Sequence, residues 1–449
     1  MSIANRDEPA LSEAPGEAAQ RARGLAQFRW YLALQASWFL GFGSQMVLFP
    51  YLVADRLAMP PQMVGYAQVA LMGPSLLLLL VGGVTADRVD TRRLLTRLHL
   101  LATVPPLALA GLIAADALSY GALIAFGLAM GTISAFTMPA RDSLLTPVVQ
   151  AGGSGLTIQR AVMLANMTQF GAQLTGMIVA SLATFVGVPP IFVYQSVALA
   201  TGAYSVTRTP PVQRAPEAAP AGTRRTTVGD IGEAFGLLLR SQSLTVVTAT
   251  VFAVGVLAIG SFLVAMPILV RDEYGGGSAR FATFSLCFWS GTFSAAIALT
   301  RKGRISRPGR AMMASIMTSS AISLGLSVPG PFWLLGILSY CWGCCAGVNM
   351  TMSRSLIQEA APFAQRARLL SIYQLGYMGG APVGATAMGF VVAEIGPHAA
   401  FYVPSAGLAA IALVLFTRTR FWSMTLAEVV AERDRLWAPG AEAARERPA

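Results

Sequence analysis

Charged residues are scarce in this chain of 449 residues. Asp, Glu, Lys and Arg make up 12% of it, whereas hydrophobic residues make up 55%. A soluble domain carries about 25% charged residues, so most of this surface must face something other than water. Apolar segments long enough to cross a bilayer, roughly 20 residues each, follow one another along the chain. The composition therefore predicts an all-α membrane protein.

Residues that bind metals or carry out redox chemistry are also few. The chain has two histidines and four cysteines, and three of the cysteines share one apolar segment, at residues 341–345. There they suit helix packing as small polarisable side chains, while the alternative, a redox or metal role, requires polar and accessible thiols. We expect no metal and no cofactor.

Catalytic constellations are missing from the apolar segments as well. They contain no cluster of His, Asp and Glu, no activated serine or cysteine, and no glycine-rich loop with a lysine that would bind a nucleotide. We therefore expect neither enzymatic activity nor ATP hydrolysis.

Twelve apolar segments are separated by short breaks in which Pro, Gly and charge cluster. The expected spans are residues 28–53, 62–86, 93–114, 118–141, 157–184, 188–207, 244–270, 277–300, 309–328, 331–354, 367–394 and 397–417. One longer polar break divides them six and six. The expected parts are a tail at 1–27, a six-helix bundle at 28–207, a central loop at 208–243, a second bundle at 244–417 and a tail at 418–449.

Two of these polar parts lead to narrower expectations. Residues 1–27 are polar and mixed in charge, unlike a signal peptide, and we expect a disordered cytoplasmic tail. Residues 228–238, at the end of the central loop, predict either a short amphipathic helix on the membrane surface or an early start of the seventh span.

Basic residues are unevenly placed between the breaks. If both termini are cytoplasmic, the outer loops hold only Arg56, Arg271 and Arg280, and the remaining 29 of the 32 basic residues lie inside. Basic residues resist translocation, so we expect a multi-pass protein of the bacterial inner membrane with cytoplasmic termini. Contact with anionic lipid head groups accounts for the net charge of +11, and we expect no nucleic-acid partner.

The two halves of the chain resemble each other weakly. Residues 138–145 read MPARDSLL and residues 350–357 read MTMSRSLI, at corresponding places in the two halves. Two parallel six-helix repeats related by an axis along the membrane normal form the architecture of major facilitator transporters. We expect this fold, in a monomer.

The loop between the second and third spans carries the most specific motif, GGVTADRVDTRR at residues 82–93. It resembles the major facilitator loop signature, in which a glycine and three residues precede Asp-Arg and a basic cluster. Gly83 permits a close helix approach, and Asp87 suits a helix N-terminus, where the dipole favours an anion. The resemblance implies a latch that joins the two halves in the outward-facing state, with Asp87 near the start of the eleventh span and an arginine near Asp142. The expected latch residues are Gly83, Asp87, Arg88, Arg92, Arg93, Arg141 and Asp142.

The alternative interpretation of this motif is a positive cluster that only orients the chain in the membrane. It explains the arginines but leaves Gly83 and Asp87 at their spacing unexplained. Thr91 replaces a residue that is usually basic, and the matching loop of the second half, RKGR at residues 301–304, lacks the aspartate. Only the first half therefore carries the full signature.

Residues 74–95, 135–141 and 374–384 are similar to one branch of the superfamily, the enterobactin-exporter-like proteins and related drug and secretion transporters. The resemblance implies export, with proton antiport as the energy source. The chain departs from the antiporter pattern in its fifth span, which has no proline. A Gly- and Pro-rich sequence lies instead around Pro382 in the eleventh span.

Polar residues in a membrane span should face protein or a water-filled cavity. Asn166, Gln169 and Gln173 recur on one helical face, where they either line a cavity or bond to other helices. For single aromatics such as Trp38, plain packing is the alternative. In the family the cavity is built mainly from spans 1, 4, 7 and 10. The expected cavity residues are Gln35, Trp38, Gln45, Asn166, Gln169, Gln173, Tyr340, Asn349, Gln374 and Tyr377.

No carboxylate lies clearly at the middle of a span. The proton-coupling candidates are Asp55, Asp142 and Glu394, although Asp55 is next to Arg56 and a local ion pair is the alternative.

The sequence thus favours a secondary active exporter of small amphipathic molecules, such as a drug, siderophore or secondary metabolite, working by alternating access. The expected partners are the substrate, protons and the lipid bilayer. The alternatives are an importer of a neutral or lipid-like solute, and a transport-dead sensor that keeps the fold.

Overall fold

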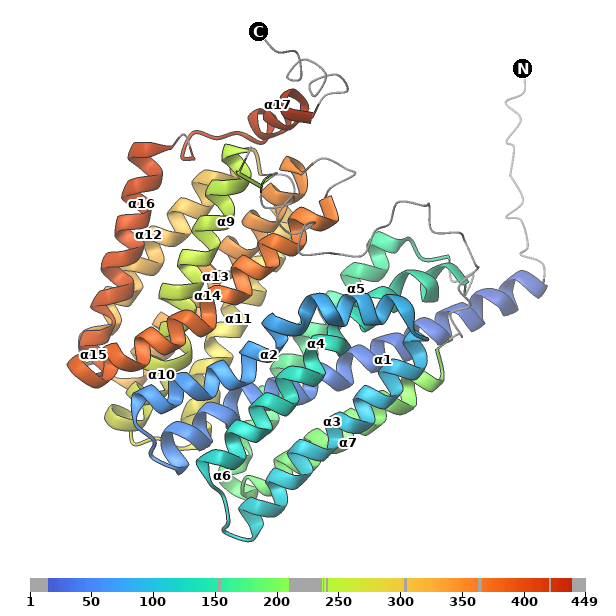
Figure 1. The fold of residues 1–449 in the computed structure, drawn as a ribbon, viewed down its shortest axis with the longest axis horizontal. Helices are drawn as coiled ribbons and strands as arrows, with labels where there is room; N and C mark the ends of the chain where they lie inside the picture. Colours follow the sequence, from blue (N-terminus) through green and yellow to red (C-terminus); the bar gives the residue numbers. More distant parts are fainter. Residues whose placement is uncertain are drawn as a thin grey trace, which may run out of the picture.

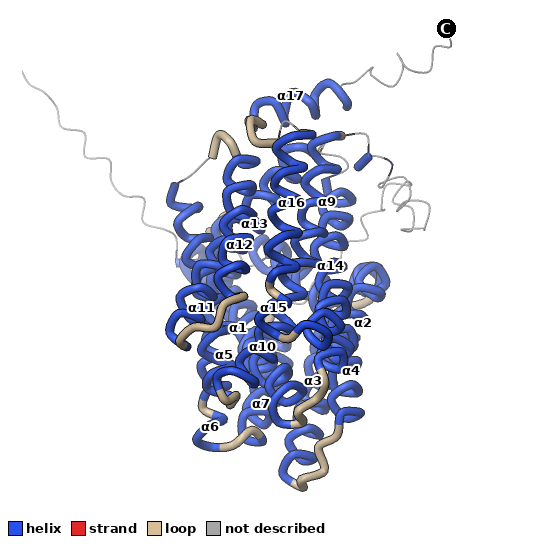
Figure 2. Tube along the Cα trace, turned by 90° about the vertical axis from the view of Figure 1, so that its left-hand side faces the viewer, coloured by secondary structure: helices blue, strands red, loops and turns tan. Residues whose placement is uncertain are grey.

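The computed structural model describes residues 15–151, 155–209, 236, 238–239, 241–302, 305–361, 366–419 and 421–437. Its secondary structure over these residues is helical throughout (Figures 1 and 2). Nine of the described helices are long and apolar enough to cross a membrane. Helices suit this setting because each backbone N–H and C=O finds its partner within the same segment, where water is absent.

The first half of the bundle contains six long helices. Its elements are α1 (Pro15–Tyr51), the π-helix η1 (Leu52–Arg56), α2 (Pro61–Arg88), α3 (Thr91–Ala114), α4 (Tyr120–Ala151), α5 (Ile158–Ser181), the short α6 (Ala183–Val186) and α7 (Pro189–Thr207).

The described part of the second half repeats this arrangement and continues into one more helix. Its elements are α9 (Gln242–Val254), the π-helix η2 (Gly255–Ile259), α10 (Gly260–Tyr274), α11 (Ser278–Lys302), α12 (Pro308–Leu326), α13 (Phe332–Ala360), α14 (Arg366–Ile395), the short α15 (Pro397–Ala400), α16 (Tyr402–Arg418) and α17 (Leu426–Trp437). The segments α9, η2 and α10 follow one another without a break and form the seventh span.

Each of the twelve expected spans coincides with one of these helical segments, but the ends differ. Helix α1 begins at Pro15, inside the expected tail 1–27. Its first turns are rich in Ala, Glu, Gln and Arg, which favour helix, so the helix extends beyond its apolar part. Most of the expected central loop, including nearly all of residues 228–238, lies outside the described residues.

Helices pair in the same order in both halves. In the first half α1 packs on α5, α2 on α4, and α3 on α7. In the second half the seventh span packs on α14, α11 on α13, and α12 on α16. This repeated pairing shows two pseudo-symmetric halves, as the sequence predicts.

The paired helices touch backbone to backbone at glycines. A Cβ on Gly43 of α1 would overlap the Gln173 carbonyl of α5, and one on Gly176 of α5 would overlap the Leu40 carbonyl. In the second half a Cβ on Gly343 of α13 would overlap the Phe288 carbonyl of α11. Small residues allow such close approach in lipid, where helix association depends on van der Waals packing.

Helix α17 lies across one end of the second half, near the C-terminus (Figure 1). It starts with a capping box: the Thr425 N–H donates to Glu428 Oε2 (2.8 Å), and the Glu428 N–H donates to Thr425 Oγ1 (3.3 Å). The Ser241 hydroxyl donates to Glu432 Oε1 (3.0 Å), and the Ser243 hydroxyl donates to the same carboxylate. These contacts place an anion at the N-terminus of α9, where the helix dipole favours it.

We predict that Gly43→Ala lowers the melting temperature of the purified protein in detergent. The added methyl group meets backbone, which cannot rotate away, and such overpacking costs about 1–3 kcal/mol. The matched control is Gly171→Ala on α5, where a Cβ meets nothing within 4 Å. It should melt at or above the wild-type temperature, because alanine favours helix over glycine by about 1 kcal/mol. Equal melting temperatures for the two variants would contradict this packing.

Candidate functional site

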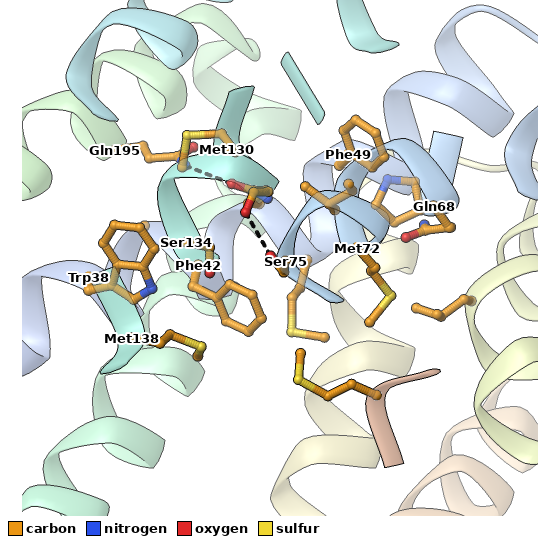
Figure 3. A pocket seen from close by; sticks show the side chains of 18 of the residues that line it. Trp38, Phe42, Phe49, Gln68, Met72, Ser75, Met130, Ser134, Met138 and Gln195 are labelled. Atoms are coloured by element: carbon orange, nitrogen blue, oxygen red, sulfur yellow. Dashed lines mark hydrogen bonds between the residues drawn. The ribbon is translucent and has the colours of Figure 1, made fainter. Parts of the chain in front are cut away.

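A cavity of about 130 Å³, here called the first lobe, lies within the first half of the bundle. Helices α1, α2, α4 and α7 form most of its wall, and Figure 3 shows its side chains around a common space. The wall is mainly apolar, with Trp38 and Met130 among its members. Its larger polar side chains are three glutamines, Gln45, Gln68 and Gln195.

A larger cavity of about 240 Å³, the second lobe, lies within the second half. Phe262, Phe288, Trp289 and Trp342 make one side of it aromatic. The Phe262 and Phe288 ring centroids are 4.1 Å apart, and the Phe288 and Trp342 rings meet edge to face at 6.2 Å. The seventh span borders the second lobe through its π-helix η2, and π-bulges are frequent at functional sites.

Some side chains border both lobes, and we call them the septum. Three come from the first half and two from the second. The septum residues are Phe42, Met46, Met72, Leu263 and Met378. The lobes are thus neighbours within the central space, and these five residues form part of the wall of both.

Among the described residues that line the two lobes, none has a charged side chain. Burying an unpaired charge is costly, so the walls are built for an uncharged occupant. Methionines such as Met130, Met138 and Met350 add to the septum methionines along the walls. Unbranched methionine adapts its shape to what it contacts and is common at promiscuous binding surfaces.

The polar residues of the lobes are partly buried behind the walls. In the first lobe Gln195 Nε2 donates to Gln45 Oε1 (3.2 Å). Trp38 Nε1 and Gln195 Oε1 in the first lobe, and Trp289 Nε1 and Asn349 Nδ2 in the second, are buried without a hydrogen-bond partner. Buried polar groups normally have partners, so these atoms would gain hydrogen bonds in a conformation that exposes them.

Five of the ten expected cavity residues line the lobes. Trp38 and Gln45 border the first lobe, and Asn349, Gln374 and Tyr377 border the second.

The other five are engaged elsewhere. Gln35 Nε2 donates to Gln169 Oε1 (3.4 Å), Gln173 Nε2 faces Met46 Sδ (3.4 Å), and Asn166 and Tyr340 are exposed on the bundle surface. The fifth-span residues Gln169 and Gln173 therefore contact side chains of α1, Gln35 and Met46.

The septum and the methionines of the walls were missed in the sequence. An apolar residue on a helix face looks the same whether it packs against a neighbouring helix or lines a cavity, so no local signal identifies Met72 or Met378. Their role depends on which helices come together.

The expected latch residues are only partly described. The surroundings of Gly83 and the side chains of Asp87 and Arg88 are not described in α2. Arg92 Nη2 donates to the Thr207 carbonyl at the end of α7, and Arg93 Nε lies 3.5 Å from Asp90 Oδ2 at the N-terminus of α3. The latch stays a prediction.

Arg141 is buried in α4, with 3% of its side chain exposed. Its guanidinium carbon lies 4.8 Å from the centre of the Phe39 ring, and Nη2 is 3.4 Å from Asp142 Oδ1. The Asp142 side chain is 72% exposed, and Arg141 Nε and Nη1 have no partner. A buried cation within a membrane bundle is a functional candidate by default. Arg141 lies one helical turn after Met138 of the first lobe.

The proton-coupling candidates lie away from both lobes. Asp142 and Glu394 are exposed. Asp55 lies in η1, where its Oδ2 accepts the Gly277 N–H of the other half (3.3 Å). The described ion pair of Arg56 is with Asp116, at 3.9 Å, and not with its neighbour Asp55.

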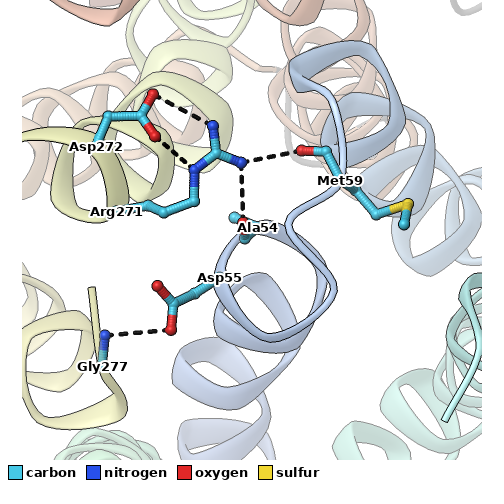
Figure 4. A network of polar contacts seen from close by, with 6 residues as sticks. All are labelled: Ala54, Asp55, Met59, Arg271, Asp272 and Gly277. Atoms are coloured by element: carbon cyan, nitrogen blue, oxygen red, sulfur yellow. Dashed lines mark hydrogen bonds and ion pairs between the residues drawn. The ribbon is translucent and has the colours of Figure 1, made fainter. Parts of the chain in front are cut away.

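This Asp55 contact belongs to a polar junction between the halves (Figure 4). Arg271 Nη1, at the end of α10, donates to the carbonyls of Ala54 (2.9 Å) and Met59 (3.1 Å). Arg271 is itself paired with Asp272 at 2.6 Å. The junction lies at the end of the bundle that is away from both described chain ends, and we call this the far end. The two halves diverge toward the opposite end, which we call the terminal end (Figure 1).

A family model described as transmembrane secretion effector, within the major facilitator superfamily, matches residues 25–444. The chain belongs to this family. It is a major facilitator transporter and a multi-pass membrane protein whose cargo is a small molecule. A sequence search among curated proteins finds no match.

Solved structures show the same fold. The nucleoside transporter NupG superposes with a TM-score of 0.67 at 14% identity, covering 87% of this chain and 98% of that one. The xylose transporter XylE from E. coli, in an inward open conformation, has a TM-score of 0.63 at 13% identity, covering 90% and 98%.

A bacterial homologue of the human lysosomal transporter Spinster, inward-facing and unoccupied, has a TM-score of 0.60 at 14% identity, covering 95% and 100%. At these identities the likeness concerns the fold alone.

We predict that Arg141→Met melts at or above the wild-type temperature. The variant removes a buried charge with unused donors and keeps an apolar chain, and such replacements are often neutral or stabilising by about 1–4 kcal/mol. Asp142→Asn, at an exposed neighbour, should change stability by less than about 1 kcal/mol. A marked loss of thermal stability in Arg141→Met alone would mean that the arginine holds the fold together and would refute this interpretation.

Proposed function

We propose that this transporter is a proton-coupled exporter of small, uncharged amphipathic molecules that works by alternating access. The carrying observation is the central space built from both halves, whose described lining residues are all uncharged. A secondary transporter binds its substrate between two such repeats and exposes the site by rocking one against the other. Export is supported by the secretion function named in the family description.

The far-end junction supports a state that is closed on that side. Arg271 and Asp55 reach across to the opposite half, and the Thr184 and Ser278 hydroxyls meet at 2.9 Å, also between the halves. The loading conformation of an exporter must receive substrate from the cytoplasm. We place the terminal end on the cytoplasmic side of the inner membrane, because 29 of the 32 basic residues then lie there.

Import of a neutral solute is the second candidate. The structural neighbours named for nucleosides and xylose are supporting observations. The walls of both lobes are mostly apolar and aromatic, which does not suit a sugar. Accumulation of substrate inside or outside the cell separates the two directions.

We predict that cells producing the protein expel uncharged fluorescent amphiphiles, and that a protonophore stops this efflux. Asn349→Leu should reduce the rate by about tenfold or more, because a lost hydrogen bond in a buried site costs about 1–3 kcal/mol. The matched control is Tyr340→Phe, an exposed position on the same helix outside both lobes.

Three results decide this experiment. Efflux that survives the protonophore would refute proton coupling. Accumulation of the substrate inside the cell would refute export and favour import. An unchanged rate in Asn349→Leu, with the protein shown to be in the membrane, would remove the central space as the transport site.

We also predict that Arg271→Ala loosens the far-end junction. It removes two charged hydrogen bonds, worth about 1.5–3 kcal/mol each, so the population open at the far end should rise at least about tenfold. The measurement is the rate at which a membrane-impermeant maleimide, added to the far-end side, labels Met72→Cys in a background without native cysteines. Arg56→Ala is the control, since Arg56 has only an exposed ion pair. Equal labelling rates in the two variants would show that Arg271 does not hold the junction closed.

A further inference from the structure

His398 lies at the far end of the bundle, on the short helix α15, and its ring contacts two other elements of the second half. Its Nδ1 lies 2.9 Å from the Leu326 carbonyl oxygen at the end of α12. Its Nε2 lies 4.0 Å from Glu273 Oε1, in the last turn of α10. His398 lines neither lobe, so the central space does not account for these contacts.

Both groups that face the nitrogens of this ring are acceptors. A carbonyl oxygen only accepts, so Nδ1 must carry a hydrogen and donate it to Leu326. In the neutral imidazole Nε2 is then a bare acceptor, and it faces a carboxylate and has no hydrogen-bond partner. In the imidazolium both nitrogens donate. The geometry therefore favours a proton on Nε2, where it forms a charge-assisted contact with Glu273.

The end of α12 adds to this preference for a charged ring. The last carbonyls of an α-helix have no partner within the helix, and the helix dipole places partial negative charge there. A cation at this position is stabilising by about 0.3–1 kcal/mol at an exposed site and by up to about 2 kcal/mol at a partly buried one. The His398 side chain is 15% exposed, so it belongs with the partly buried cases.

The other ionisable groups around the ring have partners or face solvent. Helix α15 packs against α10, α14 and α16, and α10 also packs against α11. The remaining ionisable residues that these helices place at the far end are Arg271, Asp272, Tyr274, Arg280, Glu394 and Tyr402. Arg271 and Asp272 pair with each other. The Tyr274 hydroxyl donates to a backbone carbonyl between α12 and α13 (2.8 Å), and Arg280 donates to the Tyr274 carbonyl.

The α14 and α16 residues of that set, Glu394 and Tyr402, are exposed. The described side chains that α12 and α13 place beside the ring are apolar, with Leu334 and Leu338 among them. Among the described residues, the charge that faces Nε2 is therefore the Glu273 carboxylate.

The last turn of α10 also carries the far-end junction. Arg271 donates to two carbonyls of the first half and pairs with Asp272, and Glu273 follows directly in the chain (Figure 4). When an ion pair to α15 holds this turn, Arg271 has less freedom to lose on contact with the other half. Immobilising a side chain at an interface costs about 0.5–1.5 kcal/mol, so a turn that is already held favours the closed junction.

We propose that His398 and Glu273 form a proton-binding site that senses the pH on the far-end side of the membrane. A proton on His398 joins α10, α12 and α15, and the closed far end binds this proton more tightly than the open far end. By linkage, the population that is closed at the far end rises as the pH falls.

The proton at this site regulates the junction and is not the one carried in transport, because the site borders neither lobe. The inference rests on the proposed function for its side of the membrane, since the far end faces outward in that proposal.

Proton binding is tested by NMR on the purified full-length protein in lipid nanodiscs with isotope-labelled histidine. The chain has two histidines, His99 and His398, so the His398→Gln variant assigns the signals. They are followed between about pH 5 and pH 8, where the charge of histidine changes. Glu273→Gln should weaken proton binding at His398 about two- to fivefold, as expected for the loss of a partly exposed ion pair.

The matched control is Glu394→Gln, which removes an exposed carboxylate on the neighbouring helix α14 and should have a smaller effect on the His398 signal. Equal effects of the two variants would mean that the general field of the far end, and not the contact with Glu273, binds the proton. That result would overturn the site.

The response of the junction is tested by the distance between spin labels at Ala115→Cys in the first half and Trp333→Cys in the second, in a background without native cysteines. Both positions are exposed. Lowering the pH from about 8 to about 5 should raise the ratio of closed to open molecules about threefold or more.

Two variants of the sensor decide the outcome. His398→Gln should abolish the pH response, and His398→Lys, which stays charged throughout this range, should hold the ratio near the wild-type value at low pH. A response that persists in His398→Gln would overturn the proposal. A His398 signal that titrates while the distance stays independent of pH would overturn it as well.

This proposal and the proposal of proton-coupled export can fail separately. If the junction responds to pH through His398 and no efflux of any compound is found, the sensor stands and the proposed function fails. If efflux collapses with a protonophore and the distance between the labels does not change with pH, export stands and the sensor is wrong.

Discussion

Close contact between helix backbones is the interaction on which the rest of this structure depends. In lipid there is no hydrophobic force to press helices together, so association depends on packing. Where Gly43 and Gly176 bring α1 and α5 into backbone contact, and Gly343 brings α13 onto α11, the helices inside each half become rigid units. The two halves also meet backbone to backbone, where Gly65 of α2 faces the Ala385 carbonyl of α14 and Gly389 of α14 faces the Pro61 carbonyl. The same two helices contribute residues to both lobes and to the septum.

The placement of charge follows from the same division. The described residues that line the lobes are uncharged, whereas the junction at the far end uses Arg271 and Asp55. A charge-assisted hydrogen bond formed near water can be exchanged for hydration when the halves separate, so part of its energy is recovered when it is broken in a transport cycle. A buried ion pair in the centre would have to be broken without that compensation. Arg141 is a charged residue buried inside the first half, and its Nε and Nη1 have no hydrogen-bond partner.

The order and position of the helices could be predicted from the sequence, because a span needs a long apolar run and each break contains Pro, Gly or charge. The early start of α1 and the existence of α17 could not, since polar helices lack that run. In the site, Gln45 and Gln173 look alike in the sequence, yet one lines a lobe and the other contacts Met46 across α1 and α5. Which of them faces the cavity depends on neighbours far apart in the chain, and so does the role of the methionines.

Helix α17 has a consequence for how the second half moves. Through Glu432 it is hydrogen-bonded to Ser241 and Ser243 at the start of α9, and it packs on α13. The last described helix is thereby joined to the first turn of the seventh span, 191 residues earlier in the chain. Since the seventh span borders the second lobe, removal of α17 would release one end of a helix that forms the wall of the central space.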